Sequence, residues 1–240
     1  SRTSTAARLR QSKHLEGEKA AGRTLRTATR ASQRAAESVA GTTMPKTVGG
    51  EIRFDFEPAP RRLLASHLGP LTAGGTTIID HVDIGVERAD RIWLRGRNGV
   101  GKTTLLRALV ADADLPVDKL LYLEQEMTPE QVAEVMRETA TLEPKQRGEV
   151  LALVALLGVD PRVLLASRSP SPGEARKLAM ALGLGRGSWL VALDEPTNHL
   201  DLPSIERLQA ALASYPGALI VVSHDDEFAR ALRMEPFDLS

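Results

Sequence analysis

The feature that constrains this chain most is a glycine-rich stretch at residues 96–103, which reads GRNGVGKT. Two glycines bracket four residues and precede a lysine and a threonine, the spacing of a phosphate-binding loop. Glycines let successive backbone N–H groups turn inward around phosphate oxygens at a helix N-terminus. Lys102 supplies a compact charge for the β- and γ-phosphates, and the Thr103 hydroxyl can reach magnesium. Residues 91–95 and the apolar helix pattern of residues 103–110 predict a strand and a helix on either side.

A second motif stands at residues 190–195, LVALDE, where two carboxylates follow four apolar residues. In open α/β sheets ligands bind beyond the carboxyl ends of the strands. We therefore expect Asp194 to hold magnesium, directly or through water, and Glu195 to polarise an attacking water as general base. Taken alone, such a pair is more often a helix N-cap.

The hydrophobic patterning predicts an α/β fold. Short apolar runs at residues 119–123, 189–193 and 218–222 suit buried parallel strands, and residues 125–180 are mostly helical in pattern. Alternation predicts half-buried strands at residues 52–56 and 78–86, the latter in an antiparallel edge sheet with a turn at Gly74-Gly75. The expected fold is a parallel-sheet core with an antiparallel edge sheet and a helical insertion.

The charge of the chain is zero overall but unevenly distributed. Residues 1–50 hold ten basic and three acidic residues, which leaves +7 there and −7 in the remainder. This segment contains few apolar side chains larger than alanine, so we expect a basic helical arm at residues 1–45. Seven of the ten basic residues in residues 1–50 are arginines, which suit RNA phosphates. Candidate RNA contacts in this arm are Arg23, Arg26, Arg30 and Arg34.

Composition excludes several classes of protein. The chain has no cysteine, which removes disulfides, thiolate nucleophiles and cysteine-bound zinc. Its longest apolar run, residues 150–159, is half of the roughly 20 residues that a membrane-spanning helix needs. With no cleavable signal visible, we expect a cytoplasmic protein without membrane insertion. The chain opens on Ser1 rather than methionine, which suggests a fragment.

These motifs together resemble the nucleotide-binding domain of the ATP-binding-cassette (ABC) superfamily, and specifically its F-type branch. The form of residues 194–201, DEPTNHLD, is typical of that branch. The resemblance implies a P-loop NTPase fold of ABC type at residues 46–240, with a helical subdomain at about residues 126–180, behind a linker arm at residues 1–45. Members carry two cassettes on one chain, lack a membrane domain and act on ribosomes.

The resemblance also implies roles for individual residues. Gln125 is similar to the glutamine that senses magnesium and the γ-phosphate, and His224 to the switch histidine that joins Glu195 in catalysis. The serine of the signature loop acts on nucleotide held by the partner cassette. The implied nucleotide-binding residues are Gly96, Asn98, Gly99, Gly101, Lys102, Thr103, Thr104 and Gln125; the magnesium ligands are Thr103, Gln125 and Asp194; the signature residues are Ser171, Gly173 and Glu174.

Each of these residues also has a simpler interpretation, and the chain departs from the family twice. Gln125 could be a surface residue at a strand end, Ser171 a helix N-cap, and His224 a hydrogen-bonded histidine after a buried strand. Prolines at positions 170 and 172 replace the usual leucine and glycine of the signature. Residues 57–92 contain no aromatic residue to stack on adenine, so a preference for ATP over GTP is implied by the family only.

The function that follows is magnesium-dependent ATP binding and hydrolysis by the second cassette of an F-type protein on the ribosome. The arm would contact ribosomal RNA or tRNA, and a first cassette on the same chain would be the partner. Such proteins include translation factors and antibiotic-resistance proteins that protect the ribosome. Two alternatives are the ATPase subunit of an ABC membrane transporter and a non-enzymatic RNA-binding module.

Overall fold

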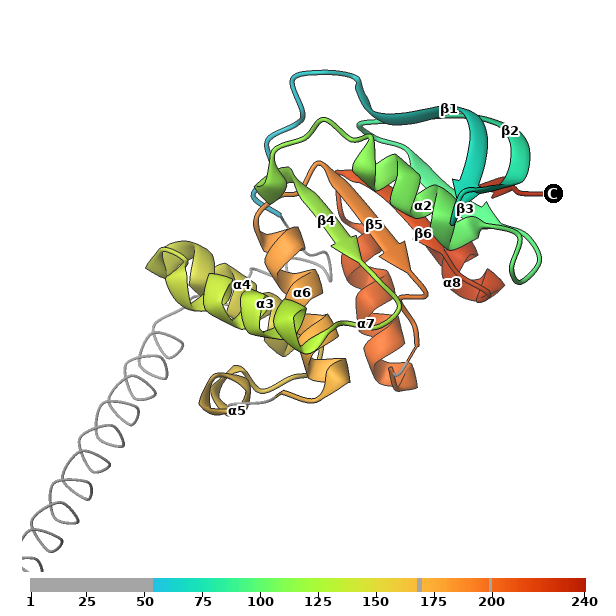
Figure 1. The fold of residues 1–240 in the computed structure, drawn as a ribbon. Coiled ribbons are helices and arrows are strands. Elements are labelled where there is room, and N and C mark those ends of the chain that lie inside the picture. Colours follow the sequence, from blue (N-terminus) through green and yellow to red (C-terminus); the bar gives the residue numbers. More distant parts are fainter. Residues whose placement is uncertain (1–53, 168–169, 199) are drawn as a thin grey trace, which may run out of the picture.

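The structure is a computed structural model that describes residues 54–167, 170–198 and 200–240 (Figure 1). The predicted arm at residues 1–45, with Arg23, Arg26, Arg30 and Arg34, lies outside the described residues. The central element is a parallel sheet in the spatial order β4-β5-β6-β3-β7. Its strands are β3 (Arg91–Arg95), β4 (Leu120–Leu123), β5 (Leu190–Asp194), β6 (Ala218–Val222) and β7 (Glu235–Asp238).

The middle strands are buried on both faces, which explains their continuous apolar sequences. In β5, Leu190 and Ala192 face one core, while Val191 and Leu193 face the other. Helix α2 (Lys102–Ala111) covers the first face, and helices α6 (Pro172–Gly185), α7 (Leu202–Ala213) and α8 (Asp226–Ala231) cover the second (Figure 1). The predicted parallel-sheet core is confirmed, because residues 91–95, 119–123, 189–193 and 218–222 match β3 to β6 to within one residue at each end.

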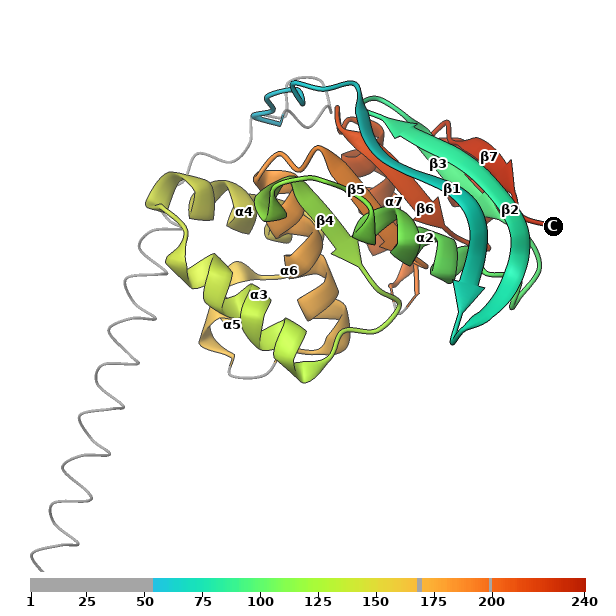
Figure 2. The ribbon, with the colours of Figure 1, turned by 45° about the horizontal axis from the view of Figure 1, so that its top comes forward.

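A separate antiparallel hairpin lies against α2; the sequence pattern predicted its turn and its second strand, but not its first. Strands β1 (Leu63–Ala73) and β2 (Thr76–Glu87) pair along their length and turn at Gly74-Gly75, where both glycines have positive φ. The hairpin buries Leu71, Val82 and Ile84 in the core that α2 shares. Figure 2 shows its two long strands curving past β3 and β7.

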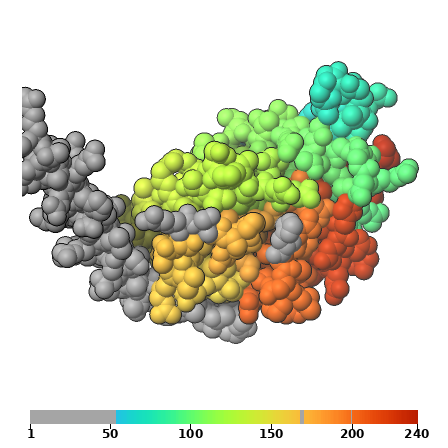
Figure 3. All heavy atoms as spheres, turned by 60° about the horizontal axis from the view of Figure 1, so that its bottom comes forward, coloured from blue at the N-terminus to red at the C-terminus, as the bar shows by residue number. Residues whose placement is uncertain are grey.

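Four helices form the insertion between β4 and β5. They are α3 (Pro129–Thr141), α4 (Pro144–Leu156), α5 (Pro161–Ala166) and α6 (Pro172–Gly185); a short 3-10 turn, η1 (Val117–Lys119), precedes β4. Each of the four begins with a proline, a residue suited to the first helical position because it needs no hydrogen-bond acceptor there. From the underside of Figure 1, this group adjoins α7 and α8, and the tip of the hairpin (cyan) projects at the far end (Figure 3).

The strand predicted at residues 52–56 is wrong in the part that the structure describes, since residues 54–56 belong to no strand. Phe54 and Phe56 instead meet the ring of Tyr215 edge-on, at centroid distances of 4.9 and 5.8 Å. Alternation here reflects two aromatic rings reaching one buried tyrosine. Tyr215 in turn donates its hydroxyl to the carbonyl of Ser188 at 2.6 Å, just before β5.

Replacing Tyr215 with phenylalanine should lower the free energy of unfolding. The ring and its contacts with Phe54 and Phe56 are kept, but the Ser188 carbonyl loses a buried donor, which costs about 1–3 kcal/mol. Urea unfolding followed by circular dichroism measures the change. An unchanged midpoint and slope would show that this hydrogen bond adds nothing to stability.

Candidate functional site

The glycine-rich stretch forms the loop between β3 and α2, and its backbone requires glycine. Gly96, Gly99 and Gly101 have φ of +153°, +78° and +112°, a region that side chains disfavour. A Cβ on Gly101 would also lie 2.7 Å from Cδ1 of Ile78 in the hairpin. Gly101 begins α2 with no side-chain cap, so the first amides of the helix face the loop without a side-chain acceptor there. Such a helix start favours an anion.

Lys102 closes the loop from within the first turn of α2. Its side chain is buried, and Nζ donates to the carbonyl of Gly96 at 2.9 Å and to that of Arg97 at 3.1 Å. The ammonium group is therefore held at the concave side of the loop by two backbone oxygens. A bound phosphate could exchange with these oxygens as the acceptor.

Thr103 and Asp194 bring the loop and the end of β5 together. The Thr103 hydroxyl donates to Oδ2 of Asp194 at 2.8 Å, and Asp194 is only 2% exposed. A hydroxyl and a carboxylate oxygen are hard donors that suit magnesium, which commonly takes one or two carboxylates and completes its shell with phosphates and water. Within the described residues no cluster of three or more His, Cys, Asp or Glu could hold a metal alone.

Glu195 follows in a strained turn beside His224. Its φ is +46°, unusual for a residue with a side chain, and its N–H donates to the Val222 carbonyl at 2.8 Å. The carboxylate lies 3.5 Å from Nε2 of His224 and accepts a long bond from the His224 backbone N–H. Burial raises the pKa of Glu195, and His224 opposes that shift. The helix-cap interpretation fails here, because the next helix, α7, is capped by Asp201.

These groups line one pocket of about 590 Å³ at the carboxyl edge of the sheet. It brings together the phosphate loop, Gln125 after β4, the carboxylates of Asp194 and Glu195 at the end of β5, and His224 after β6. The sequence alone did not identify Ala73, Ile78 and Asn198, which also line it; Asn198 could have been found in the DEPTNHLD stretch. The lining residues are Ala73, Ile78, Asn98, Gly99, Gly101, Lys102, Thr103, Thr104, Gln125, Asp194, Glu195, Asn198, Val222 and His224.

The predicted signature residues are not part of this pocket. Ser171 and Gly173 line a second hollow between α3 and the start of α6. Ser171 is the N-cap of α6: it accepts from the Glu174 N–H, and the Glu174 carboxylate accepts from the Ser171 N–H at 2.8 Å. The bond from the Ser171 N–H to this carboxylate, and a second from the Ser171 hydroxyl at 2.7 Å, lower the pKa of Glu174. Pro172 occupies the first helical position, where its missing donor costs nothing.

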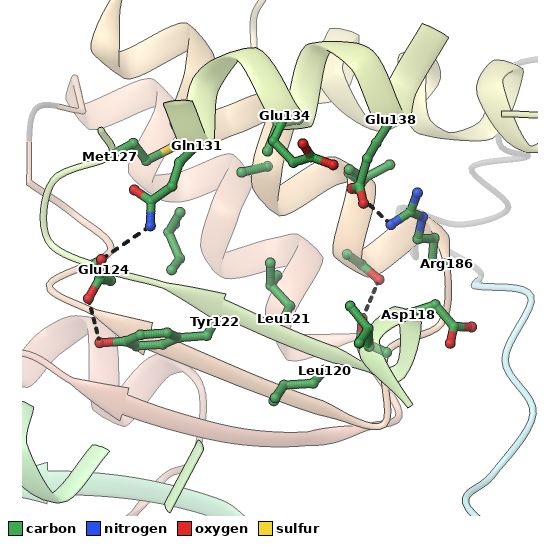
Figure 4. A pocket seen from close by; sticks show the side chains of 17 residues that line it. Asp118, Leu120, Leu121, Tyr122, Glu124, Met127, Gln131, Glu134, Glu138 and Arg186 are labelled. Atoms are coloured by element: carbon green, nitrogen blue, oxygen red, sulfur yellow. Dashed lines mark hydrogen bonds and ion pairs between the residues drawn. The ribbon is translucent and has the colours of Figure 1, made fainter. Parts of the chain in front are cut away.

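The end of β4 is tied to the helical insertion just before Gln125. Glu124 accepts hydrogen bonds from Gln131 Nε2 at 3.2 Å and from the Tyr122 hydroxyl at 3.3 Å, in a pocket between β4 and α3 (Figure 4). Gln131 also closes the capping box of α3 with Thr128. The loop that carries Gln125 therefore leaves the sheet from an anchored residue.

Comparisons with known proteins agree with this site. A family model described as ABC transporter matches residues 79–198, half of the chain. The chain is 37% identical over 180 residues to ATP-binding protein Uup of Caulobacter vibrioides, covering 71% of this chain and 29% of that protein. It is 33% identical over 198 residues to the ribosome protection protein VmlR of Bacillus subtilis, covering 77% and 36%. It is 31% identical over 172 residues to ABC transporter F family member 2 of Arabidopsis thaliana, covering 65% and 25%.

The protein thus carries an ABC-type ATPase domain. The chain belongs to the ABC family, and the resemblance to the F-type branch is confirmed by these relatives. It spans roughly a third of the length of the relatives it matches. The fold also matches a dimeric ATP-binding cassette bound to ADP and Pi, with a TM-score of 0.58 at 18% identity over 75% of this chain and 94% of that one. None of the described helices is long and apolar enough to cross a membrane.

Replacing Lys102 with methionine should weaken nucleoside triphosphate binding about 10- to 100-fold, because it removes a charge-assisted hydrogen bond worth about 1.5–3 kcal/mol. Isothermal titration with ATP measures the dissociation constant. Lys119→Met is the matched control, since Lys119 donates to the Arg186 carbonyl at the opposite end of the sheet. Equal affinities for the three proteins would exclude Lys102 as a phosphate ligand.

Proposed function

We propose that this chain is the second cassette of an F-type ABC protein, with the end of the linker between its cassettes, and that it hydrolyses ATP with magnesium on the ribosome. The observation that carries the catalytic part is the single pocket that joins the phosphate loop to Asp194, Glu195 and His224. A module that only bound nucleotide could use Asp194 for magnesium, but it would have no need of a base such as Glu195 next to it.

The groups around the pocket have distinct roles in this reaction. The loop amides and Lys102 bind the β- and γ-phosphates, and Thr103, Asp194 and Gln125 would hold the magnesium ion. Bound magnesium neutralises charge on the phosphates. Glu195 takes the proton of the attacking water, and burial, which raises its pKa, makes its carboxylate a stronger base. His224, half exposed beside Glu195, would contact the γ-phosphate.

The pocket offers many contacts to phosphate but few to a nucleotide base. The hairpin presents Ala73 and Ile78 to the pocket, and these aliphatic side chains offer neither a stacking ring nor a hydrogen bond to a base edge. His67, a ring on the same hairpin, pairs with Asp112 at 3.5 Å. ATP as the substrate is supported by the relatives, several of which are named ATP-binding proteins.

A partner cassette is the natural counterpart of the separated signature loop. Ser171, Gly173 and Glu174 begin α6 outside the phosphate-loop pocket. We infer that they act on nucleotide held by a first cassette of the same full-length protein, whose own signature loop would complete the pocket described here. The chain's coverage of about a third of its relatives supports this arrangement.

The ribosome as the site of action is supported by composition and by one relative. The first fifty residues carry +7, with seven arginines among ten basic residues, and VmlR is a ribosome protection protein. We propose that Arg23, Arg26, Arg30 and Arg34 contact RNA phosphates, either in translation itself or in protection from an antibiotic. The same composition lacks aromatic residues that would stack on single-stranded bases.

Glu195→Gln should keep ATP binding and reduce hydrolysis about 10²- to 10⁴-fold, because the amide cannot accept the proton. In the wild type, the raised pKa of Glu195 places the acid limb of the rate profile above the usual range of a glutamate: activity is present above this pKa and falls as pH decreases through it. Phosphate release measured from about pH 4 to about pH 9 checks both. Hydrolysis by Glu195→Gln at the wild-type rate would show that another group is the base.

Changing Arg23, Arg26, Arg30 and Arg34 to glutamine should weaken ribosome binding and flatten its salt dependence. Each RNA phosphate that is no longer neutralised reduces the slope of log affinity against log salt by about 0.7–0.9. Co-sedimentation of the full-length Glu195→Gln protein with ribosomes and ATP measures both quantities. A control with the same charge change replaces Arg62, Arg137, Arg162 and Arg230, each paired with a carboxylate on the cassette surface. If the two variants had the same ribosome affinity and salt dependence, the arm would act only as a spacer.

A further inference from the structure

One arginine of α6 bonds to the ends of two strands of the sheet. Arg176 is 2% exposed, and its guanidinium donates to four backbone carbonyls. One terminal nitrogen donates to Glu124 O at 2.7 Å and to Gln125 O. The other donates to Asp194 O at 3.3 Å and to Glu195 O at 3.1 Å.

These carbonyls lie where the sheet can no longer hold the two strands together. Pairing between β4 and β5 stops at Leu123 and Leu193. Beyond that pair the guanidinium bridges the two strand ends, and its planar fork reaches both at once. The spacing between the Gln125 loop and the Glu195 turn is thus fixed by one side chain.

The burial of this charge is costly unless its donors are satisfied. Among the described residues no carboxylate forms an ion pair with Arg176. Carbonyl oxygens meet the charge at its two terminal nitrogens, its buried Nε has no hydrogen-bond partner, and burial lowers its pKa. A leucine, like those that surround it on α6, would fill this place more cheaply if packing were the only requirement. The free-energy cost of burying this charge indicates that Arg176 is needed to hold the Gln125 loop and the Glu195 turn in position.

Arg176 also lies near the start of the signature helix. Ser171 caps α6, and Arg176 follows within the first two turns of the same helix. We propose that Arg176 is a positioning residue that couples the signature end of α6 to Gln125 and Glu195, so that engagement of Ser171 with nucleotide on a partner cassette aligns the hydrolytic groups of this chain's own pocket. This inference rests on the proposed function.

The chain offers a matched control in Arg91. This arginine, at the opposite end of the sheet, donates to the carbonyls of Leu212 at 3.1 Å, Ala213 at 3.5 Å and Tyr215 at 2.6 Å, and burial lowers its pKa as well. Arg91→Met therefore removes the same chemistry from the fold and leaves the pocket untouched.

The first test compares Arg176→Met, Arg176→Lys and Arg91→Met in the full-length protein. We expect Arg176→Met to lower kcat at least tenfold while the Kd for ATP changes less than threefold. Arg176→Lys should recover part of kcat, since an ammonium reaches one strand end but not both. Arg91→Met should lower the Tm and preserve kcat. A kcat within twofold of wild type in Arg176→Met, or a loss of kcat that merely follows Tm in both methionine variants, overturns the inference.

The second test needs no turnover and uses this chain without nucleotide. Hydrogen exchange should become faster at residues 124–127 and 195–198 in Arg176→Lys, which serves also if the methionine variant fails to fold, and should be unchanged there in Arg91→Met. Unchanged exchange in Arg176→Lys contradicts the bridge directly. A wild type that neither binds nor hydrolyses ATP overturns the proposed function instead, and the exchange result then still decides whether Arg176 fixes the two loops.

Discussion

The hydrogen bond from Thr103 to Asp194 joins the two halves of the pocket, and the other groups are placed relative to it. Thr103 lies in the first turn of α2, so the bond fixes the phosphate loop against the end of β5. Strand β5 is paired on both sides, with β4 and with β6, which leaves Asp194 little freedom. Glu195 then turns back to bond Val222 and faces His224. Each functional group of the pocket therefore lies within a few residues of the end of a strand, and no long loop is needed to position it.

The close packing of these groups also determines the pKa of Glu195. Burial makes the charged form of Glu195 less favourable and Asp194 adds repulsion, whereas His224 and Lys102 attract the carboxylate. The net effect is a raised pKa, which suits a base that must take a proton from water. Lys102 lies on the loop carbonyls rather than on a carboxylate, so its charge remains directed toward the place where phosphate oxygens would lie.

Most of the parallel sheet and the chemical groups of the pocket could be predicted from sequence, because buried strands are written as apolar runs and the phosphate loop as a fixed glycine spacing. Strand β7 could not: its four residues are largely exposed, include Pro236, and pair only at the edge of the sheet. The alternation of Phe54 and Phe56 led to a wrong strand prediction, because both side chains contact Tyr215 from a segment that is not a strand. The sequence shows Arg176 as a charged residue in a largely apolar helix, but only the tertiary structure shows the backbone carbonyls that it contacts.

The prolines of the signature loop illustrate how a departure from a family pattern can be neutral. Pro172 stands at the first position of α6, where the backbone N–H has no partner within the helix, and Ser171 still accepts from Glu174. In the proposed arrangement, backbone donors for nucleotide on a partner cassette would come from residues after Pro172, beginning with Gly173, which lacks a side chain and lines the open hollow beside Ser171. The loop lacks backbone donors at positions 170 and 172 and keeps the serine hydroxyl and the glycine amide, so Pro172 alone is no argument against a working half-site.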